Sequence, residues 1–348
     1  MLKMPLKCLD ALFLELSKEH QVFAPMEKAG SVSFFPWKEG DTVCLDTLLT
    51  DHSPKSFFFP QSETLYRARR EEGSLSIVPE EAEEISSVYF GVRACDRRSF
   101  EILDRVFLST PCDSCYESKR RNGYVVTLAC GNPEDTCFCQ TFGIDPAWPG
   151  GDVSVWIADG DLYWKSLTEK GEALTELVEG LFEAGDHEKA EEEKAKIRKK
   201  LEALPLKDLS LGRFEHPDSA MDLFESEQWE TLSDTCLGCG ICTFLCPTCQ
   251  CYDICDYDTG HEIRKFRCWD SCMYPGFTEM SHGNNRNSQM QRFRQRFMHK
   301  LVYFPENNGG VYSCVGCGRC LRKCPSSLNI VRVIKAIGES DAEGGNDE

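Results

Sequence analysis

The chain has 348 residues, of which 41% are hydrophobic and 11% aromatic, so it can bury a sizeable core and is not wholly disordered. Acidic residues outnumber basic residues by 57 to 39, a net charge of −18, which argues against a nucleic-acid partner and against an anionic membrane surface. No run of 18 apolar residues occurs, so we expect no integral membrane segment. Acidic side chains in the first 20 residues favour an amphipathic helix over a signal peptide.

Cysteine is the unusual feature of the composition, with 21 residues. Eight lie between Cys8 and Cys139, and thirteen lie between Cys236 and Cys324. An odd number, tight Cys-x-x-Cys spacing and the absence of a signal peptide disfavour a disulfide scaffold. They favour thiolates bound to metal in a reducing compartment, which points to the cytoplasm.

Residues 1–165 have the pattern of an α/β domain, because short apolar runs recur between glycine, proline and charged residues. Residues Ser99–Leu108 place apolar side chains at helical spacing and predict a helix after a strand and a cysteine-containing loop. The runs predicted as strands are Ser31–Phe35, Ser56–Phe59, Val88–Val92, Tyr124–Leu128 and Val153–Ile157.

Four cysteines of this domain are candidate ligands of a third cluster. Cys95 and Cys130 each follow a predicted strand, and Cys137 and Cys139 lie in the next loop. If the two strands are parallel neighbours, these thiols converge at the carboxyl edge of the sheet, where ligands collect in open α/β sheets. Buried packing cysteines and a zinc site remain alternatives. The Cys112–Cys115 pair could substitute as ligands, whereas Cys8 and Cys44 are expected to have packing roles.

Residues 166–235 are expected to form a charged helical linker. An apolar stripe runs from Leu174 to Phe182, and a second helix is predicted over Ala190–Leu204, before Pro205. The tail, residues 338–348, is acidic and glycine-rich and is predicted to be disordered.

Residues 236–337 contain two copies of the pattern C-x2-C-x2-C-x3-C-P, which is typical of two-cluster bacterial ferredoxins. Three thiolates on a tight glycine-containing loop bind three irons of one cubane, and the fourth cysteine points to the neighbouring cluster. Zinc usually takes separate Cys-x-x-Cys pairs, so paired zinc sites are the weaker alternative. The predicted ligand sets are Cys236, Cys239, Cys242 and Cys324 for the first 4Fe-4S cluster, and Cys246, Cys314, Cys317 and Cys320 for the second.

The segment between the motifs, Pro247–Ser313, is longer than an ordinary ferredoxin linker. It carries five further cysteines and a basic run that is either a solvated helix face or a positive surface for docking or for raising a cluster's potential. The cysteines are Cys249, Cys251, Cys255, Cys268 and Cys272, and the basic run is Arg286, Arg292, Arg294, Arg296, His299 and Lys300.

Several segments together resemble one known family. They are Phe90–Asp96, Asp135–Cys139, Cys246–Cys251, Trp269–Cys272 and His299–Lys300, together with both ferredoxin motifs. The family contains an iron–sulfur subunit of anaerobic sulfite reductase and the iron–sulfur beta subunit of cytoplasmic nickel–iron hydrogenases (sulfhydrogenases), and the resemblance runs from about Ser56 to Pro325. It implies an electron-transfer subunit that pairs with a flavin- and NAD(P)-binding protein and serves a catalytic subunit. It also supports the four N-terminal cysteines as functional, and a further site at Cys249, Cys251 and Cys272.

The sequence therefore predicts an α+β protein with an N-terminal α/β domain, a helical linker and a bacterial-type two-cluster ferredoxin-like domain. We expect a cytoplasmic relay subunit with two 4Fe-4S clusters and a third in the N-terminal domain. One alternative is that the N-terminal domain is itself a reductase site for a sulfur compound. The other is a zinc-stapled interaction module. No dinucleotide-binding glycine motif and no catalytic triad stands out, so we assign no catalytic residue.

Overall fold

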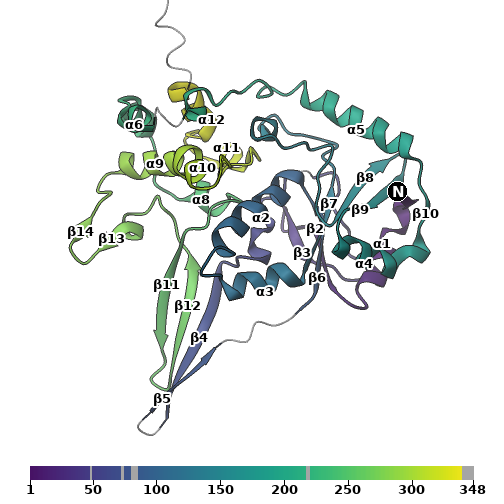
Figure 1. Ribbon diagram of the computed structural model, residues 1–348, viewed down its shortest axis with the longest axis horizontal. Helices are drawn as coiled ribbons and strands as arrows, with labels where there is room; N and C mark the ends of the chain where they lie inside the picture. The colour runs from purple at the N-terminus through teal and green to yellow at the C-terminus, as the bar shows by residue number, and fades with distance from the viewer. Residues whose placement is uncertain (48, 72–73, 80–84, 217–219, 339–348) are drawn as a thin grey trace, which may run out of the picture.

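The computed structural model describes residues 1–348 except 48, 72–73, 80–84, 217–219 and 339–348. Figure 1 shows three parts: a large sheet with helices on its faces, a long β arm, and a group of short helices beside the arm. The predicted disordered tail lies outside the described residues, apart from Gly338.

The large sheet has eight strands in the order β10-β1-β9-β8-β7-β6-β2-β3. Its centre is parallel, since β2 pairs with β6, β6 with β7, and β7 with β8 in the same direction, and the outer pairs are antiparallel. Alternate side chains of the central strands are apolar on both faces, as expected for a sheet that is covered on both sides. The strands are β1 (Leu2–Pro5), β2 (Gln21–Lys28), β3 (Ser31–Pro36), β6 (Ser87–Val92), β7 (Gly123–Leu128), β8 (Val153–Ala158), β9 (Asp161–Ser166) and β10 (Glu183–Ala184).

Helices cover both faces of this sheet. On one face, α1 (Leu9–Leu16) and α4 (Glu169–Val178) contribute Phe13 and Leu174 to one apolar cluster. On the other face, α2 (Ala94–Phe107) and α3 (Ser114–Asn122) pack on β6 and β7, and α5 (His187–Leu201) packs on β8. The segment expected to link two domains therefore begins with a helix whose apolar side lies in the core of the sheet.

The prediction of a strand at Ser56–Phe59 is wrong. The segment Pro54–Phe57 is a short 3-10 helix, which begins at proline and is capped by Ser53, whose hydroxyl accepts from the Lys55 N–H at 3.2 Å. Phe58 and Phe59 are fully buried. The apolar run therefore reflects burial against α2 and α3 and not a strand period.

The β arm is a four-stranded antiparallel sheet in the order β11-β12-β4-β5 (Figure 1). Strands β4 (Ser62–Glu71) and β5 (Ser74–Pro79) come from the N-terminal region, whereas β11 (Tyr252–Asp258) and β12 (Glu262–Trp269) come from the segment between the two ferredoxin motifs. The long insertion between the motifs thus pairs with the N-terminal region through β12 and β4.

The C-terminal part consists of short helices around a second apolar core. Its main element, α9 (Gln289–Met298), begins at a capping box formed by Ser288 and Gln291 and continues into the π-helix His299–Tyr303. The other α-helices of this part are α6 (Ala220–Glu225), α7 (Gln228–Ser233), α8 (Ile241–Phe244), α10 (Phe304–Asn307), α11 (Arg319–Lys323) and α12 (Ile330–Val333), and β13 (Glu279–Met280) pairs with β14 (Gly283–Asn284) in a two-stranded ribbon.

Candidate iron–sulfur sites

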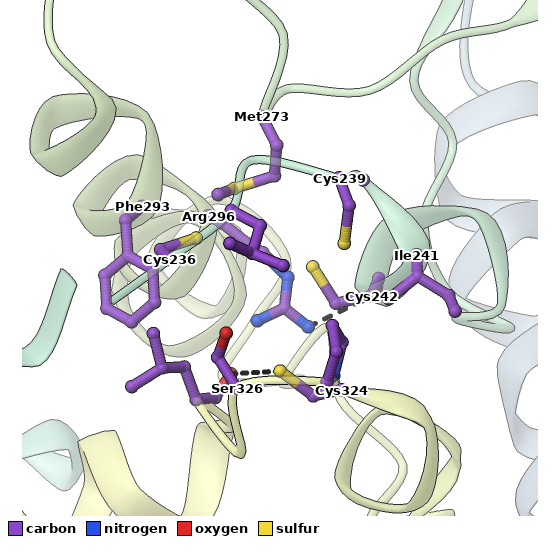
Figure 2. Close-up of a pocket in the computed structure, with 13 residues that line it drawn as sticks. Cys236, Cys239, Ile241, Cys242, Met273, Phe293, Arg296, Cys324 and Ser326 are labelled. Atoms are coloured by element: carbon purple, nitrogen blue, oxygen red, sulfur yellow. Dashed lines mark hydrogen bonds between the residues drawn. The ribbon is translucent and has the colours of Figure 1, made fainter. Parts of the chain in front are cut away.

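The four cysteines predicted for the first cluster line one cavity of about 390 Å³, including its open mouth. Figure 2 shows Cys236, Cys239, Cys242 and Cys324 around this space, with Arg296 beside them. The loop turns at Gly240, the residue before α8, which has a φ of +74°. A Cβ at this position would lie 2.7 Å from the Tyr274 hydroxyl oxygen. The structure therefore brings the distant Cys324 to the loop of the first motif.

Two polar side chains hold the loop of this first site. Tyr274 donates its hydroxyl proton to the Cys239 carbonyl at 3.1 Å, and the Gln289 amide donates to Cys236 Sγ at 3.6 Å. Burial raises the pKa of the Cys242 thiol to about 11, and Arg296 acts in the opposite direction. A thiolate here therefore needs compensating positive charge, which a metal supplies.

In the second predicted set, Cys246 is a neighbour of all three cysteines of the second loop, Cys314, Cys317 and Cys320. Burial, with a smaller contribution from the neighbouring Cys246, raises the pKa of Cys314 to about 12, while Lys300 acts in the opposite direction. The Lys300 ammonium donates to Cys246 Sγ at 3.4 Å, to Thr248 Oγ1 at 2.9 Å and to the Ser313 carbonyl at 2.9 Å. The lysine thus fixes Cys246 against the segment that enters the second motif.

The four N-terminal cysteines line a second cavity, of about 370 Å³. Strands β6 and β7 are parallel neighbours, and Cys95 and Cys130 follow them at the same edge of the sheet. Cys95 lies in the first turn of α2, because this helix begins at Ala94, before the apolar pattern that predicted it. Burial raises the pKa of Cys130 to about 11 and raises those of Cys95, Cys137 and Cys139. Cys112 and Cys115, considered as substitutes, lie at α3 and do not line this cavity.

The cysteines between the motifs form two groups. Cys251 lies next to Cys272, and Cys249 lies next to Cys246, so three of these thiols lie beside the second site. Cys255 and Cys268 lie on β11 and β12, with their Sγ atoms 4.0 Å apart. Among the described residues, no three histidine, cysteine or acidic side chains converge closely enough to hold a single metal ion.

Buried cations lie among the cysteines of both motif sites. Lys300, Arg296 and Lys55 are only 2–3% exposed. Arg296 donates to the Cys242 carbonyl at 3.3 Å, and Lys55 donates to the Cys249 carbonyl at 3.0 Å, with its ammonium 4.0 Å from the centre of the Trp269 ring. Burial lowers the pKa of Lys55 to about 8, and the neighbouring cysteines are the groups that favour its charged form.

The basic run is therefore not a solvated helix face. Arg292, Arg296 and Lys300 are buried, and the Arg294 guanidinium lies 3.6 Å from the centre of the Phe224 ring. The sequence analysis named Arg296 and Lys300 as candidate cations near a cluster, but it missed Lys55, which precedes the wrongly predicted strand. The signal that could have identified Lys55 was its position next to an apolar run with three phenylalanines.

The dicluster module has known relatives. Residues 235–328 match the 4Fe-4S dicluster domain family. The chain is also 32% identical over 336 residues to sulfhydrogenase 2 subunit beta of Pyrococcus furiosus, an alignment that covers 94% of this chain and 95% of that protein. The chain belongs to the sulfhydrogenase beta-subunit family. This confirms the resemblance and the predicted α+β class, and the dicluster domain of this family member implies two 4Fe-4S clusters.

The donor chemistry of the first two sites fits such clusters, since each supplies four cysteines and the first lines a cavity. The described part of the chain contains no helix long and apolar enough to cross a membrane.

Proposed function

We propose that this chain is a multi-cluster electron-transfer subunit of a cytoplasmic anaerobic redox complex. It relays electrons between a partner that binds flavin and NAD(P) and a catalytic subunit of the hydrogenase, sulfite reductase or heterodisulfide reductase type. The observation that carries the proposal is the pair of ferredoxin motifs, folded together beside a third set of four convergent cysteines. Bound clusters of this type supply one-electron transfer at low potential.

The assigned ligands are those of the predicted sets: Cys236, Cys239, Cys242 and Cys324 in the first site, and Cys246, Cys314, Cys317 and Cys320 in the second. A third 4Fe-4S cluster at Cys95, Cys130, Cys137 and Cys139 is supported by the cavity that these residues share. Four cysteines line this cavity, as four line the cavity of the first site.

The buried cations give independent support. A charged side chain is costly to bury unless it is paired. The groups that favour the charged forms of Lys300 and Arg296 are cysteines, namely Cys246, Cys249 and Cys314 for Lys300 and above all Cys242 and Cys320 for Arg296. Thiolate-bound clusters supply the negative charge that these cations require, and the cations in turn make reduction of such a cluster easier.

Iron and acid-labile sulfide, counted with zinc in anaerobically purified protein, test this proposal. Three cubanes give about twelve iron and twelve sulfide per chain, and two give about eight of each. Cys130→Ser should lower the iron content by about four, the iron of one cubane, whereas Cys44→Ser, which is outside all three sets, should leave it unchanged. Zinc without sulfide would reject the electron-transfer function in favour of a zinc-stapled module.

We also propose a further thiolate site at Cys249, Cys251 and Cys272, next to the second site, where a metal would have to draw the three thiols closer together than they lie in the described residues. The support is the contact of Cys251 with Cys272 and of Cys249 with Cys246, together with the buried Lys55 ammonium. If metal binds there, the total metal content exceeds that of three cubanes, and Cys272→Ser lowers it. Cys268→Ser, on β12, is the control, and it should leave the total metal content unchanged.

A hollow at the sheet edge favours the second candidate function, reduction of a sulfur compound by the N-terminal region. The hollow lies at the carboxyl ends of β6, β7 and β8, is lined in part by α5, and shares Arg93 with the cavity of the N-terminal cysteines. Lys200 and Asn132 line it as well. The test is whether dithionite-reduced protein, freed of excess reductant, is reoxidised by sulfite or polysulfide. No reoxidation without partner subunits would reject this candidate.

A further inference from the structure

The N-terminal cysteine site and the second ferredoxin motif share a wall. Gly316 and Cys317 line the same cavity as Cys95, Cys130, Cys137 and Cys139. The Phe138 N–H, between two of these cysteines, donates to the Gly316 carbonyl at 2.9 Å. The loop that carries Cys137 and Cys139 therefore lies directly on the loop that carries Cys314 and Cys317.

Two glycines make this contact possible. A Cβ on Gly316 would lie 2.4 Å from the Phe138 carbonyl oxygen, and one on Gly318 would lie 2.5 Å from the Thr136 carbonyl oxygen. Both residues also have positive φ, at +58° and +79°. The two loops thus pack closely at these glycines, against the backbone of Phe138 and against both the carbonyl and the hydroxyl of Thr136.

A buried ion pair closes the junction from the other side. Arg319, which precedes Cys320, donates from both terminal nitrogens to Asp96, which follows Cys95. Its Nε donates to the Thr50 carbonyl at 2.9 Å. One guanidinium thus ties the first turn of α2, with Cys95, to the first turn of α11, with Cys320.

The first motif lies on the other side of the second. Its cavity is lined by residues between 236 and 328, and none of those lining residues belongs to the N-terminal region. Its link to the second motif runs through the short helix that follows each cysteine loop, α8 in the first motif and α11 in the second. Contacts between α8 and α11 hold the two motif helices together.

We infer that the three cysteine sites form a linear series with the second-motif site in the middle, and that Arg319, Asp96 and Gly316 are the positioning residues that fix the N-terminal site to it. The inference rests on the proposed function, because it requires a cluster at the N-terminal site. The cysteines of the N-terminal site are buried, whereas Cys239 of the first motif is exposed. The first-motif site is thus the exposed end of the series, and the N-terminal site is the enclosed end.

Magnetic coupling between reduced clusters tests the order in the full-length, iron-loaded chain. Two variants are compared with the parent by EPR after dithionite reduction: Cys137→Ser, which opens the N-terminal site, and Cys239→Ser, which opens the first-motif site. In the parent, one centre should be coupled to both others. Cys137→Ser should leave the two motif centres coupled to each other. Cys239→Ser should leave the N-terminal centre coupled to the second-motif centre.

A reductive titration of the parent provides a measurement that needs no variant. The N-terminal centre should show enhanced spin relaxation when the second-motif centre is reduced, and no direct effect from the first-motif centre. Two results would overturn the order of the sites while leaving the third cluster in place, provided that the chain holds about twelve iron. One is direct coupling between the N-terminal and first-motif centres, and the other is an N-terminal centre that couples to neither. About eight iron would overturn the third cluster of the proposed function and the order with it.

Discussion

The Arg319 guanidinium and the Asp96 carboxylate form a bidentate ion pair, at 2.6 and 2.7 Å, between two side chains that are each 1% exposed. These residues are 223 positions apart, so the pair joins the beginning of α2 to the last cysteine motif. Burial alone would disfavour the charge on Arg319, and the Asp96 carboxylate is the main group that restores it. Neither partner can therefore be removed alone without leaving an uncompensated buried charge.

Asp96→Asn is expected to destabilise the protein by about 3–5 kcal/mol, because it leaves the Arg319 charge buried without a counterion. The double variant Asp96→Asn/Arg319→Met should recover part of this loss, since it removes both charges. Anaerobic denaturant unfolding of the iron-loaded variants measures both values. The control is Arg322→Met, which breaks the partly exposed pairs with Glu134 and Asp51, each of which should cost about 1 kcal/mol or less. If the double variant instead lost as much unfolding free energy as Asp96→Asn and Arg319→Met lose in sum, the coupling between the two residues would be contradicted.

Gly316→Ala should separate the two cysteine loops. The new methyl group would lie 2.4 Å from the Phe138 carbonyl oxygen, so the backbone must shift. Gly309→Ala is a matched control, because Gly309 has a similar φ of +64° but nothing within 4 Å of its Cβ position. Only the conformational cost of about 1 kcal/mol applies to the control. We expect iron loss and lower stability for Gly316→Ala, and a full iron content for Gly309→Ala. Equal effects of the two substitutions would show that the close contact does not matter.

Lys300→Met is expected to lower the reduction potential of the second-motif cluster. The substitution removes a buried positive charge that donates to Cys246 Sγ, and reduction adds negative charge there. A charged hydrogen bond is worth at least about 1.4 kcal/mol, which corresponds to about 60 mV for a one-electron couple. An EPR-monitored redox titration measures the shift. Lys323→Met, in a partly exposed pair with Asp51, should change the potential little, and an upward shift for Lys300→Met would contradict the electrostatic role.

His20 should make stability depend on pH in a region far from the cysteines. Burial lowers the pKa of His20, which accepts or donates a hydrogen bond at Ser86 Oγ and packs against Tyr124. The His20 imidazole therefore binds a proton more readily in the unfolded chain than in the folded chain. The contribution is fully present above about pH 6.5, the usual pKa of histidine, and is lost as the pH falls through the lower pKa of the folded state.

Denaturant midpoints of the parent and of His20→Gln, measured between about pH 7.5 and 5.5 on either side of the usual histidine pKa, isolate this contribution. The parent should lose more stability than the variant as the pH falls. A difference between the two proteins that stays constant across this range would contradict the assignment.

The apolar runs predicted the strands β6 and β7, because strand patterning is a local property of the chain. The structure pairs these strands in parallel, which is the condition under which Cys95 and Cys130 were expected to meet. The same reasoning failed at Ser56–Phe59, since an apolar run indicates burial but does not distinguish a strand from a short helix. The pairs Arg319–Asp96 and Lys55–Cys249 were out of reach, because they depend on which distant segments meet.

The β arm has a consequence for how the protein is made. Strand β4 can find its partner β12 only after residue 269 has been synthesised, and Cys324 of the first site is later still. A gene fragment that begins at residue 235 would produce both ferredoxin motifs, but β11 and β12 would lack the neighbour to which β12 is bonded. The dicluster segment is therefore not a module that can be cut out at its sequence boundaries.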